Sequence, residues 1–91
     1  MREFWTIHPQ AAVPLRTWHG DVSSAVWMGP QDIKDQFGHK VDFLADDRVI
    51  FDISGNKYRL IARVVFRYRA VQIKFIGPHA EYDRINPETV Q

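Results

Sequence analysis

The spacing of apolar residues changes along the chain, from a helical period in the first 37 residues to a period of two after residue 41. Phe4 and Ile7 stand three residues apart, on one side of a helix, before His8-Pro9 interrupts the pattern. A second stripe at helical spacing follows, formed by Leu15, Trp18, Val22 and Val26. Such a stripe is typical of an amphipathic helix that buries one face.

A third, shorter helix is predicted to begin after Gly29. The run 29–32 reads Gly-Pro-Gln-Asp, which supplies an N-cap residue, a proline at the first helical position and an acidic side chain in the first turn. Ile33 and Phe37 stand four residues apart and are expected to face inward, and Gly38 is expected to end the helix. The first 37 residues are therefore predicted to be helical.

Strand-like alternation begins weakly over residues 41–44 and becomes clear over residues 48–53. In the second of these runs, Val49, Phe51 and Ile53 share one face. The run Ser-Gly-Asn at 54–56 has the composition and length of a hairpin turn. We therefore predict a half-buried strand that turns back into a second strand.

The strand after this turn is predicted to be long, with an apolar face formed by Tyr58, Leu60, Ala62, Val64, Phe66 and Tyr68. A further strand over residues 71–76 is expected to bury its apolar odd-numbered positions, Val71, Ile73 and Phe75. Gln72 and Lys74 would then lie beside the arginines of the long strand. Gly77-Pro78 is expected to stop this strand, and residues 79–84 are long enough for only a turn or two of helix.

This order of elements indicates an α+β fold. N-terminal helices pack on the apolar face of an antiparallel meander, and a short C-terminal helix follows. A length of 91 residues favours a single domain over residues 1–91. Hydrophobic residues make up 45% of the chain and charged residues 25%, which is typical of a packed globular domain and not of a disordered tail.

Several classes of site are disfavoured by what the sequence lacks. The chain has no cysteine, which excludes disulfides, thiolate nucleophiles and cysteine-based zinc sites. His, Asp and Glu are not clustered at metal-ligand spacing and no glycine-rich phosphate loop is present, so we expect neither a metal nor a cofactor. No apolar run approaches the ~18–20 residues of a membrane span, and the first residues do not read as a signal peptide. We therefore expect a cytoplasmic protein without a membrane partner.

Charge is distributed unevenly although the formal net charge is only +1. Residues 1–56 carry five Lys or Arg against eight Asp or Glu, whereas residues 57–91 carry seven against three. The basic residues between positions 57 and 76 have no carboxylate among them: Lys57, Arg59, Arg63, Arg67, Arg69 and Lys74. This run favours an anionic partner, with nucleic acid as the first candidate. The alternative is that these charges simply solvate one face of a sheet.

Two segments of the chain carry a resemblance to a known family. They are SGNKYRL at residues 54–60 and FIGPHAEYD at residues 75–83. Together they resemble the HigB-type toxins of bacterial toxin–antitoxin pairs, within the RelE-like superfamily. Upstream runs fall in the same pattern, so the resemblance covers nearly the whole chain: Arg2-Glu3-Phe4-Trp5, His8-Pro9, Pro14-Leu15 with Trp18, and Asp32-Ile33-Lys34.

The resemblance implies a small ribosome-associated endoribonuclease, an mRNA interferase, that cuts messenger RNA without a metal. It also implies a helix-turn-helix antitoxin of the HigA type that silences the toxin in a hetero-oligomer. Two features depart from the family pattern. Met1 stands directly before the Arg-Glu-Phe-Trp run, so the usual first strand of the family is missing and an unpaired sheet edge is expected. Gly20 and Asp21 stand where relatives carry strong helix formers.

Cleavage of RNA without a metal needs a base for the 2′-OH proton, a cation for the developing phosphorane charge and an acid for the leaving 5′-oxygen. The candidate catalytic residues are Arg59, His79 and Tyr82. A guanidinium binds phosphate oxygens bidentately, an imidazole exchanges protons near neutral pH, and a phenol can orient a phosphate or stack on a base. Whether His79 acts as base or acid stays open, and its structural alternative is a cap on the last helix. The structural alternative for Tyr82 is a residue that closes the core.

The remaining cations are predicted to hold the RNA backbone: Lys57, Arg63, Arg67 and Lys74. Asn56 is predicted to lie at the edge of the site, although a turn residue of this type needs no function. Any of the cations can instead be a solvated surface charge that contributes little.

Three functions are therefore compared. The leading interpretation is an endoribonuclease toxin. The alternatives are a non-catalytic nucleic-acid-binding module and an inactive toxin relic that acts only in complex with its antitoxin. Replacing His79 by alanine separates the first two, because binding alone should survive the change, and growth arrest on expression separates an active toxin from a relic.

Overall fold

The computed structural model describes residues 9–54, 57–68 and 70–90. In chain order, the helical elements are η1 (Pro9–Ala11), α2 (Ala12–Ser24), α3 (Pro30–Phe37), η2 (Gly38–Lys40), η3 (Phe66–Tyr68) and α4 (His79–Tyr82). The strands are β1 (Val41–Phe43), β2 (Arg48–Ile53), β3 (Tyr58–Val65) and β4 (Ala70–Pro78). The predicted α+β fold is confirmed. The helix predicted around Phe4 and Ile7, and the turn residue Asn56, lie outside the described residues.

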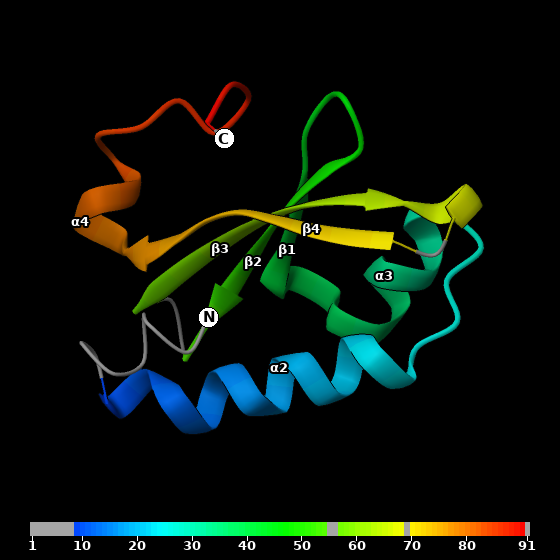
Figure 1. The fold of residues 1–91 in the computed structure, drawn as a ribbon, viewed down its shortest axis with the longest axis horizontal. Coiled ribbons are helices and arrows are strands. Elements are labelled where there is room, and N and C mark those ends of the chain that lie inside the picture. Colours follow the sequence, from blue (N-terminus) through cyan, green and yellow to red (C-terminus); the bar gives the residue numbers. More distant parts are fainter. Residues whose placement is uncertain (1–8, 55–56, 69, 91) are drawn as a thin grey trace.

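The sheet is an antiparallel meander in the order β1-β2-β3-β4. Helix α2 runs along one face, which we call the inner face, and the segment after α4 passes over the opposite, outer face (Figure 1). Alternation in β2 and β3 assigns the side chains to these faces. Phe51 and Leu60 lie on the inner face, whereas Asp52 and Arg59 lie on the outer face.

The core lies between the helices and the inner face. The predicted inward-facing residues Leu15, Ile33 and Phe51 are each at most 1% exposed. The ring of Phe51 receives two edge-on aromatic contacts, from Trp18 at a centroid distance of 5.4 Å and from Phe37 at 5.1 Å. Such edge-to-face contacts add to the stabilisation from burial, so helices α2 and α3 are attached to the same strand.

Helix α3 follows the local signals of its sequence. Gly29 is the N-cap residue, Pro30 begins the helix, and Gly38 is the C-cap residue with φ 63°, a conformation that favours glycine. The Asp32 carboxylate accepts a hydrogen bond from the Met28 N–H at 2.7 Å, which satisfies a donor just before the helix. The last member of the predicted apolar stripe, Val26, is not part of α2. The helix ends at Ser24, and Val26 is 64% exposed.

A register shift changes the predicted face of β4. Ala62 pairs with Ile73 but Ile61 pairs with Phe75, so Lys74 is an extra residue in a β-bulge. Phe75 is therefore on the outer face, opposite Ile61, and Ile76 packs against the core in its place. The prediction that this strand buries Phe75 in the core is wrong for this reason. It is also wrong for Ile73, which lies on the inner face but is 40% exposed.

The end of the long strand also differs from the prediction. Strand β3 stops at Val65, and Phe66 and Tyr68 belong to the 3-10 helix η3 instead of continuing the alternation. Phe66 packs against the core, while Tyr68 is 73% exposed. The chain turns back after β3 in the region of η3, and β4 then pairs antiparallel with β3.

The outer face is only partly polar. Ile50 and Ile61 form a cross-strand pair there, and both are buried. Arg48 on the same face is 7% exposed, and its guanidinium donates hydrogen bonds to the carbonyl oxygens of Pro87 at 3.0 Å and Val90 at 2.6 Å. These bonds attach the C-terminal segment over the part of the outer face near Arg48 (Figure 1). The end of the outer face near Arg59 and α4 is not covered by these bonds.

Candidate active site

Arg59 lies on the outer face of β3, with Asp52 of β2 on one side and Gly77 of β4 on the other. Its Nε is 3.4 Å from the Asp52 carboxylate, and its side chain is 18% exposed. The guanidinium carbon lies 4.8 Å from the centre of the Tyr82 ring, within the range of a cation–π contact. Arg59 is thus held between a carboxylate and an aromatic ring and keeps part of its surface open.

His79 is the first residue of α4, directly after the end of β4. Its backbone N–H donates a hydrogen bond to the Lys57 carbonyl at 3.2 Å, which fixes the start of the helix beside the end of the β2–β3 hairpin. Its Nδ1 is 3.2 Å from the Asp83 carboxylate, four residues on. A carboxylate at Nδ1 favours a proton on that nitrogen, so Nε2 is the ring nitrogen that can face a substrate.

Tyr82 joins these two residues. It stands one turn after His79, and the centres of the two rings are 6.1 Å apart. The same ring also contacts Arg59. The structure therefore brings the predicted catalytic residues Arg59, His79 and Tyr82 into one cluster, where β3, β4 and α4 meet.

Gly77 makes this close arrangement of strand and helix possible. A Cβ atom at position 77 would lie 2.8 Å from the Glu81 carboxylate and 2.8 Å from the Phe75 ring. Since Gly77 is paired with Arg59, a larger residue would push α4 or Phe75 away from the guanidinium. The prediction that Gly77-Pro78 stops the strand after residue 76 is wrong, because β4 continues to Pro78. Phe75 and Asp52 were not predicted in the site, because only the strand register brings them there.

The predicted RNA-binding cations are placed at different distances from this cluster. Lys57 is exposed and precedes β3 beside His79. Arg63 is four residues along the same face of β3 from Arg59, about 13 Å away. Its Nη2 is 3.5 Å from the Asp46 carboxylate, and both side chains are substantially exposed. The bulge residue Lys74 is half-buried.

Arg67 is not brought to the cluster. It lies in η3, at the opposite end of β3, where its guanidinium is 5.7 Å from the centre of the Tyr68 ring. Asn56 lies outside the described residues. The cluster is therefore flanked by Lys57, with Arg63 and Lys74 farther along the sheet.

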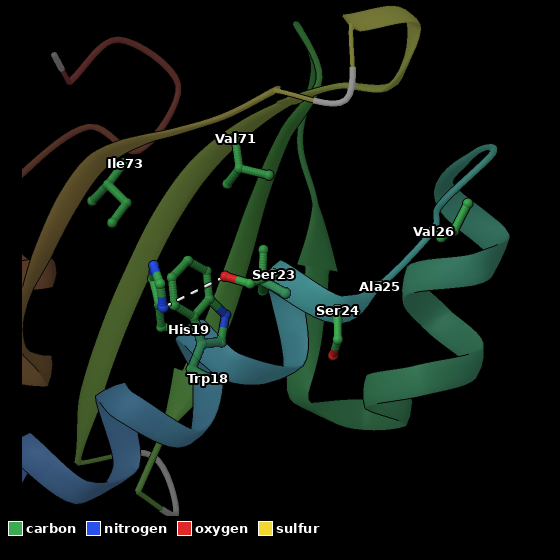
Figure 2. Close-up of a pocket in the computed structure, with 9 residues that line it drawn as sticks. Trp18, His19, Ser23, Ser24, Ala25, Val26, Val71 and Ile73 are labelled. Carbon is green, nitrogen blue, oxygen red and sulfur yellow. Dashed lines mark hydrogen bonds between the residues drawn. The ribbon is translucent and has the colours of Figure 1, made fainter.

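A hollow lies elsewhere in the described part of the molecule. It has a volume of about 550 Å³ and lies between α2 and β4, on the inner side of the sheet, with Trp18, Val22 and Val71 among its lining residues (Figure 2). His19 and Ser23 lie at the hollow, 3.5 Å apart through Nδ1 and Oγ (Figure 2). None of the candidate catalytic residues lines it. The cluster on the outer face is thus separate from this apolar hollow.

Neither a metal site nor a membrane-spanning helix is found in the described residues. Within residues 9–54, 57–68 and 70–90, no group of three or more His, Asp or Glu side chains is arranged to hold a metal ion. Over the same residues, no helix has both the length and the apolar character needed to cross a bilayer.

Comparison with protein-family models matches residues 11–85 to HigB_toxin, described as the RelE-like toxic component of a toxin–antitoxin system. The chain belongs to the HigB toxin family. The match spans α2 to α4 and so includes every element that builds the cluster. Membership in this family makes the protein the toxic component of a toxin–antitoxin pair, and it implies an antitoxin partner. A comparison with curated protein sequences found no match.

Proposed function

We propose that this HigB toxin is a metal-independent endoribonuclease that cleaves messenger RNA on the ribosome and is neutralised by a HigA-type antitoxin. The observation that carries the proposal is the convergence of Arg59, His79 and Tyr82 on the outer face. A phosphate-binding cation, a proton-exchanging imidazole and a phenol are the side chains that such a reaction uses. Family membership supports a toxic activity for the protein.

In the proposed reaction, the 2′-oxygen of the RNA attacks the adjacent phosphorus and the bond from phosphorus to the 5′-oxygen breaks. One proton leaves the 2′-OH and another is given to the 5′-oxygen. Arg59 binds the non-bridging oxygens, where negative charge increases in the transition state. His79 carries one of the two proton transfers through Nε2 and solvent water carries the other, while Tyr82 donates a hydrogen bond to the phosphate. The products are a 2′,3′-cyclic phosphate and a free 5′-OH.

The product ends and the metal requirement test this proposal. Purified toxin, active ribosomes and a translated message are combined with and without a chelator that spares the magnesium needed by the ribosome and removes transition metals. We expect equal cleavage in both cases and 2′,3′-cyclic or 3′-phosphate ends on the upstream fragment. Cleavage that leaves a 3′-OH, or that disappears with the chelator, would contradict the mechanism.

The need for a ribosome follows from the shape of the candidate site. The cluster consists of a few side chains on one small sheet face, so it offers little to position a flexible strand, and positioning is a large part of such catalysis. We expect translated messages to be cut efficiently and the same RNA, free in solution, to be a poor substrate. Comparable rates on both would contradict ribosome dependence while leaving the nuclease assignment intact.

The affinity for RNA should fall steeply with salt. If Lys57, Arg59, Arg63 and Lys74 neutralise about four phosphates, the logarithm of affinity for single-stranded RNA should fall with the logarithm of salt with a slope of roughly −3. Fluorescence anisotropy over a range of salt concentrations measures this slope. Arg63→Glu should weaken binding to all sequences alike, because a backbone contact carries no base information.

The matched control for this experiment is Lys34→Glu. Lys34 is exposed on α3, which packs on the inner side of the sheet. The two charge reversals change the net charge equally, so only a local contact distinguishes them. Equal loss of affinity in both variants, or affinity that does not change with salt, would contradict an RNA-binding outer face.

Expression separates the proposal from the inactive alternative. An active toxin should arrest growth when it is produced without an antitoxin, and co-expression of a HigA-type helix-turn-helix protein should restore growth. A chain that binds the antitoxin but never arrests growth would instead be a relic that functions only in the complex.

A further inference from the structure

Phe75 is an aromatic side chain on the cation-rich outer face, and the β-bulge puts it there. Lys74 is the extra residue, so the side-chain alternation of β4 is reversed from Phe75 onward. Without the bulge, Phe75 would point to the inner face and pack in the core. Instead it is half-buried, opposite Ile61 and next to Gly77 along the strand.

From this placement we propose that Phe75 is a base-stacking residue, which holds one nucleobase of the RNA beside the scissile phosphate. The inference rests on the proposed nuclease function and deepens it, because it names the part of the substrate that the site recognises. Purine and pyrimidine bases can both stack on an aromatic ring, so we expect this site to accept different RNA sequences.

The distances in the cluster support this arrangement. The centres of the Phe75 and Tyr82 rings are 6.5 Å apart, with an angle of 59° between the planes. Arg59 belongs to the same cluster: its guanidinium carbon is 4.8 Å from the Tyr82 centre, and it pairs with Gly77, two residues after Phe75. A base stacked about 3.5–4 Å from the Phe75 ring would keep its phosphate on the side of the cluster where Arg59 lies.

Gly77 strengthens the inference. Its missing side chain leaves the space that the Phe75 ring and the Glu81 carboxylate occupy. The edge of the ring thus lies over Gly77, whose cross-strand neighbour is Arg59. Two independent features, a bulge and a glycine, place one aromatic ring next to the candidate catalytic residues.

The competing explanation is simple packing, in which Phe75 only covers the buried Ile61 on the outer face. Any apolar side chain of similar volume satisfies that role, whereas base stacking needs an aromatic ring. Leucine and tyrosine at position 75 therefore distinguish the two explanations. Phe75→Leu keeps an apolar side chain and removes the ring, while Phe75→Tyr keeps the ring.

The experiment measures RNA binding without cleavage. All variants are made in a His79→Ala background, and their dissociation constants are measured at low salt with two short oligoribonucleotides, one intact and one with an abasic site at the cleavage position. Phe75→Leu should weaken binding of the intact RNA by about tenfold to a hundredfold, and Phe75→Tyr should retain it. Binding of the abasic RNA should be the same in all variants.

Ile73→Ala is the control on the same strand. Ile73 is 40% exposed and its side chain lies on the inner face of the sheet, opposite the face that carries Arg59. Its replacement by alanine should therefore leave the affinity for both RNAs unchanged. A spectroscopic readout is added with Phe75→Trp, whose fluorescence should be quenched by the intact RNA and not by the abasic one.

Three results would overturn the inference: equal affinity of Phe75→Leu and its parent, an equal loss on intact and abasic RNA, or no measurable binding of the intact RNA. These outcomes are distinct from a failure of the proposed nuclease function. Binding is measured in a variant whose cleavage is expected to be about 10²- to 10⁴-fold slower, so absence of cleavage by the unaltered toxin would refute the nuclease proposal without deciding the stacking result.

Discussion

Replacing Arg59 by alanine is expected to reduce RNA cleavage by about 10²- to 10³-fold, the loss typical of removing one preorganised donor from a developing oxyanion. Arg59 is fixed by Asp52 and by the Tyr82 ring, so it is oriented before the substrate arrives. Single-turnover cleavage of a translated message measures the effect. Growth arrest on expression should disappear as well.

Two further variants make this result specific. Arg59→Lys keeps the charge but loses the planar fork, so we expect it to recover only part of the rate. Arg63→Ala removes a cation from the same face of the same strand and should mainly weaken binding. Antitoxin binding and the thermal midpoint should stay close to those of the parent in all of them. Full toxicity of Arg59→Ala would contradict the assignment of the site.

Replacing His79 by alanine is expected to reduce the rate of cleavage by about 10²- to 10⁴-fold, because a positioned acid or base contributes that much. RNA affinity should change little, which also separates the nuclease from a simple binding module. Asp83→Asn should have a smaller effect through the loss of the Nδ1 partner, which lies 3.2 Å away. Rate measurements with saturating ribosomes report the catalytic step.

The control for His79 is His19→Ala. His19 is exposed on α2, beside the apolar hollow and away from the cluster, so cleavage should be unaffected. Added imidazole should restore part of the activity of His79→Ala if the ring transfers a proton. Unchanged cleavage by His79→Ala, or equal losses in both histidine variants, would show that the imidazole has no chemical role.

Local signals made much of the fold predictable. Helix α3 carries its own start and stop, from Pro30 to Gly38, and the alternation in β2 identifies Phe51 as a core residue before any tertiary contact is known. Such features depend on residues that are close in the sequence. The end of α2 could not be predicted as well, because Val26 continues the helical spacing of apolar residues although the helix ends at Ser24.

The bulge in β4 could not be predicted in the same way. The alternation of Val71, Ile73 and Phe75 is regular, and nothing in it indicates that Lys74 is an extra residue. The bulge is defined by pairing with β3, which is a tertiary feature. This is why Phe75 was assigned to the core while Ile76 occupies that position.

The candidate site was predictable as a set of residues but not as an arrangement. Family segments identified Arg59, His79 and Tyr82, and the structure brings them together. The contribution of Asp52 depends on the register of β2 with β3, where it is paired with Arg59. A sequence pattern does not specify that register, so the carboxylate beside the guanidinium was missed.

The order of strands has a consequence for how the toxin reaches its folded state. Each strand of the described sheet pairs with its neighbour along the chain, so the sheet can grow by successive hairpins that close short loops. Small closures cost little chain entropy, and folding should be correspondingly fast. Toxin freed from its antitoxin by denaturant should therefore refold alone after dilution, which means that the antitoxin acts as an inhibitor and not as a folding template.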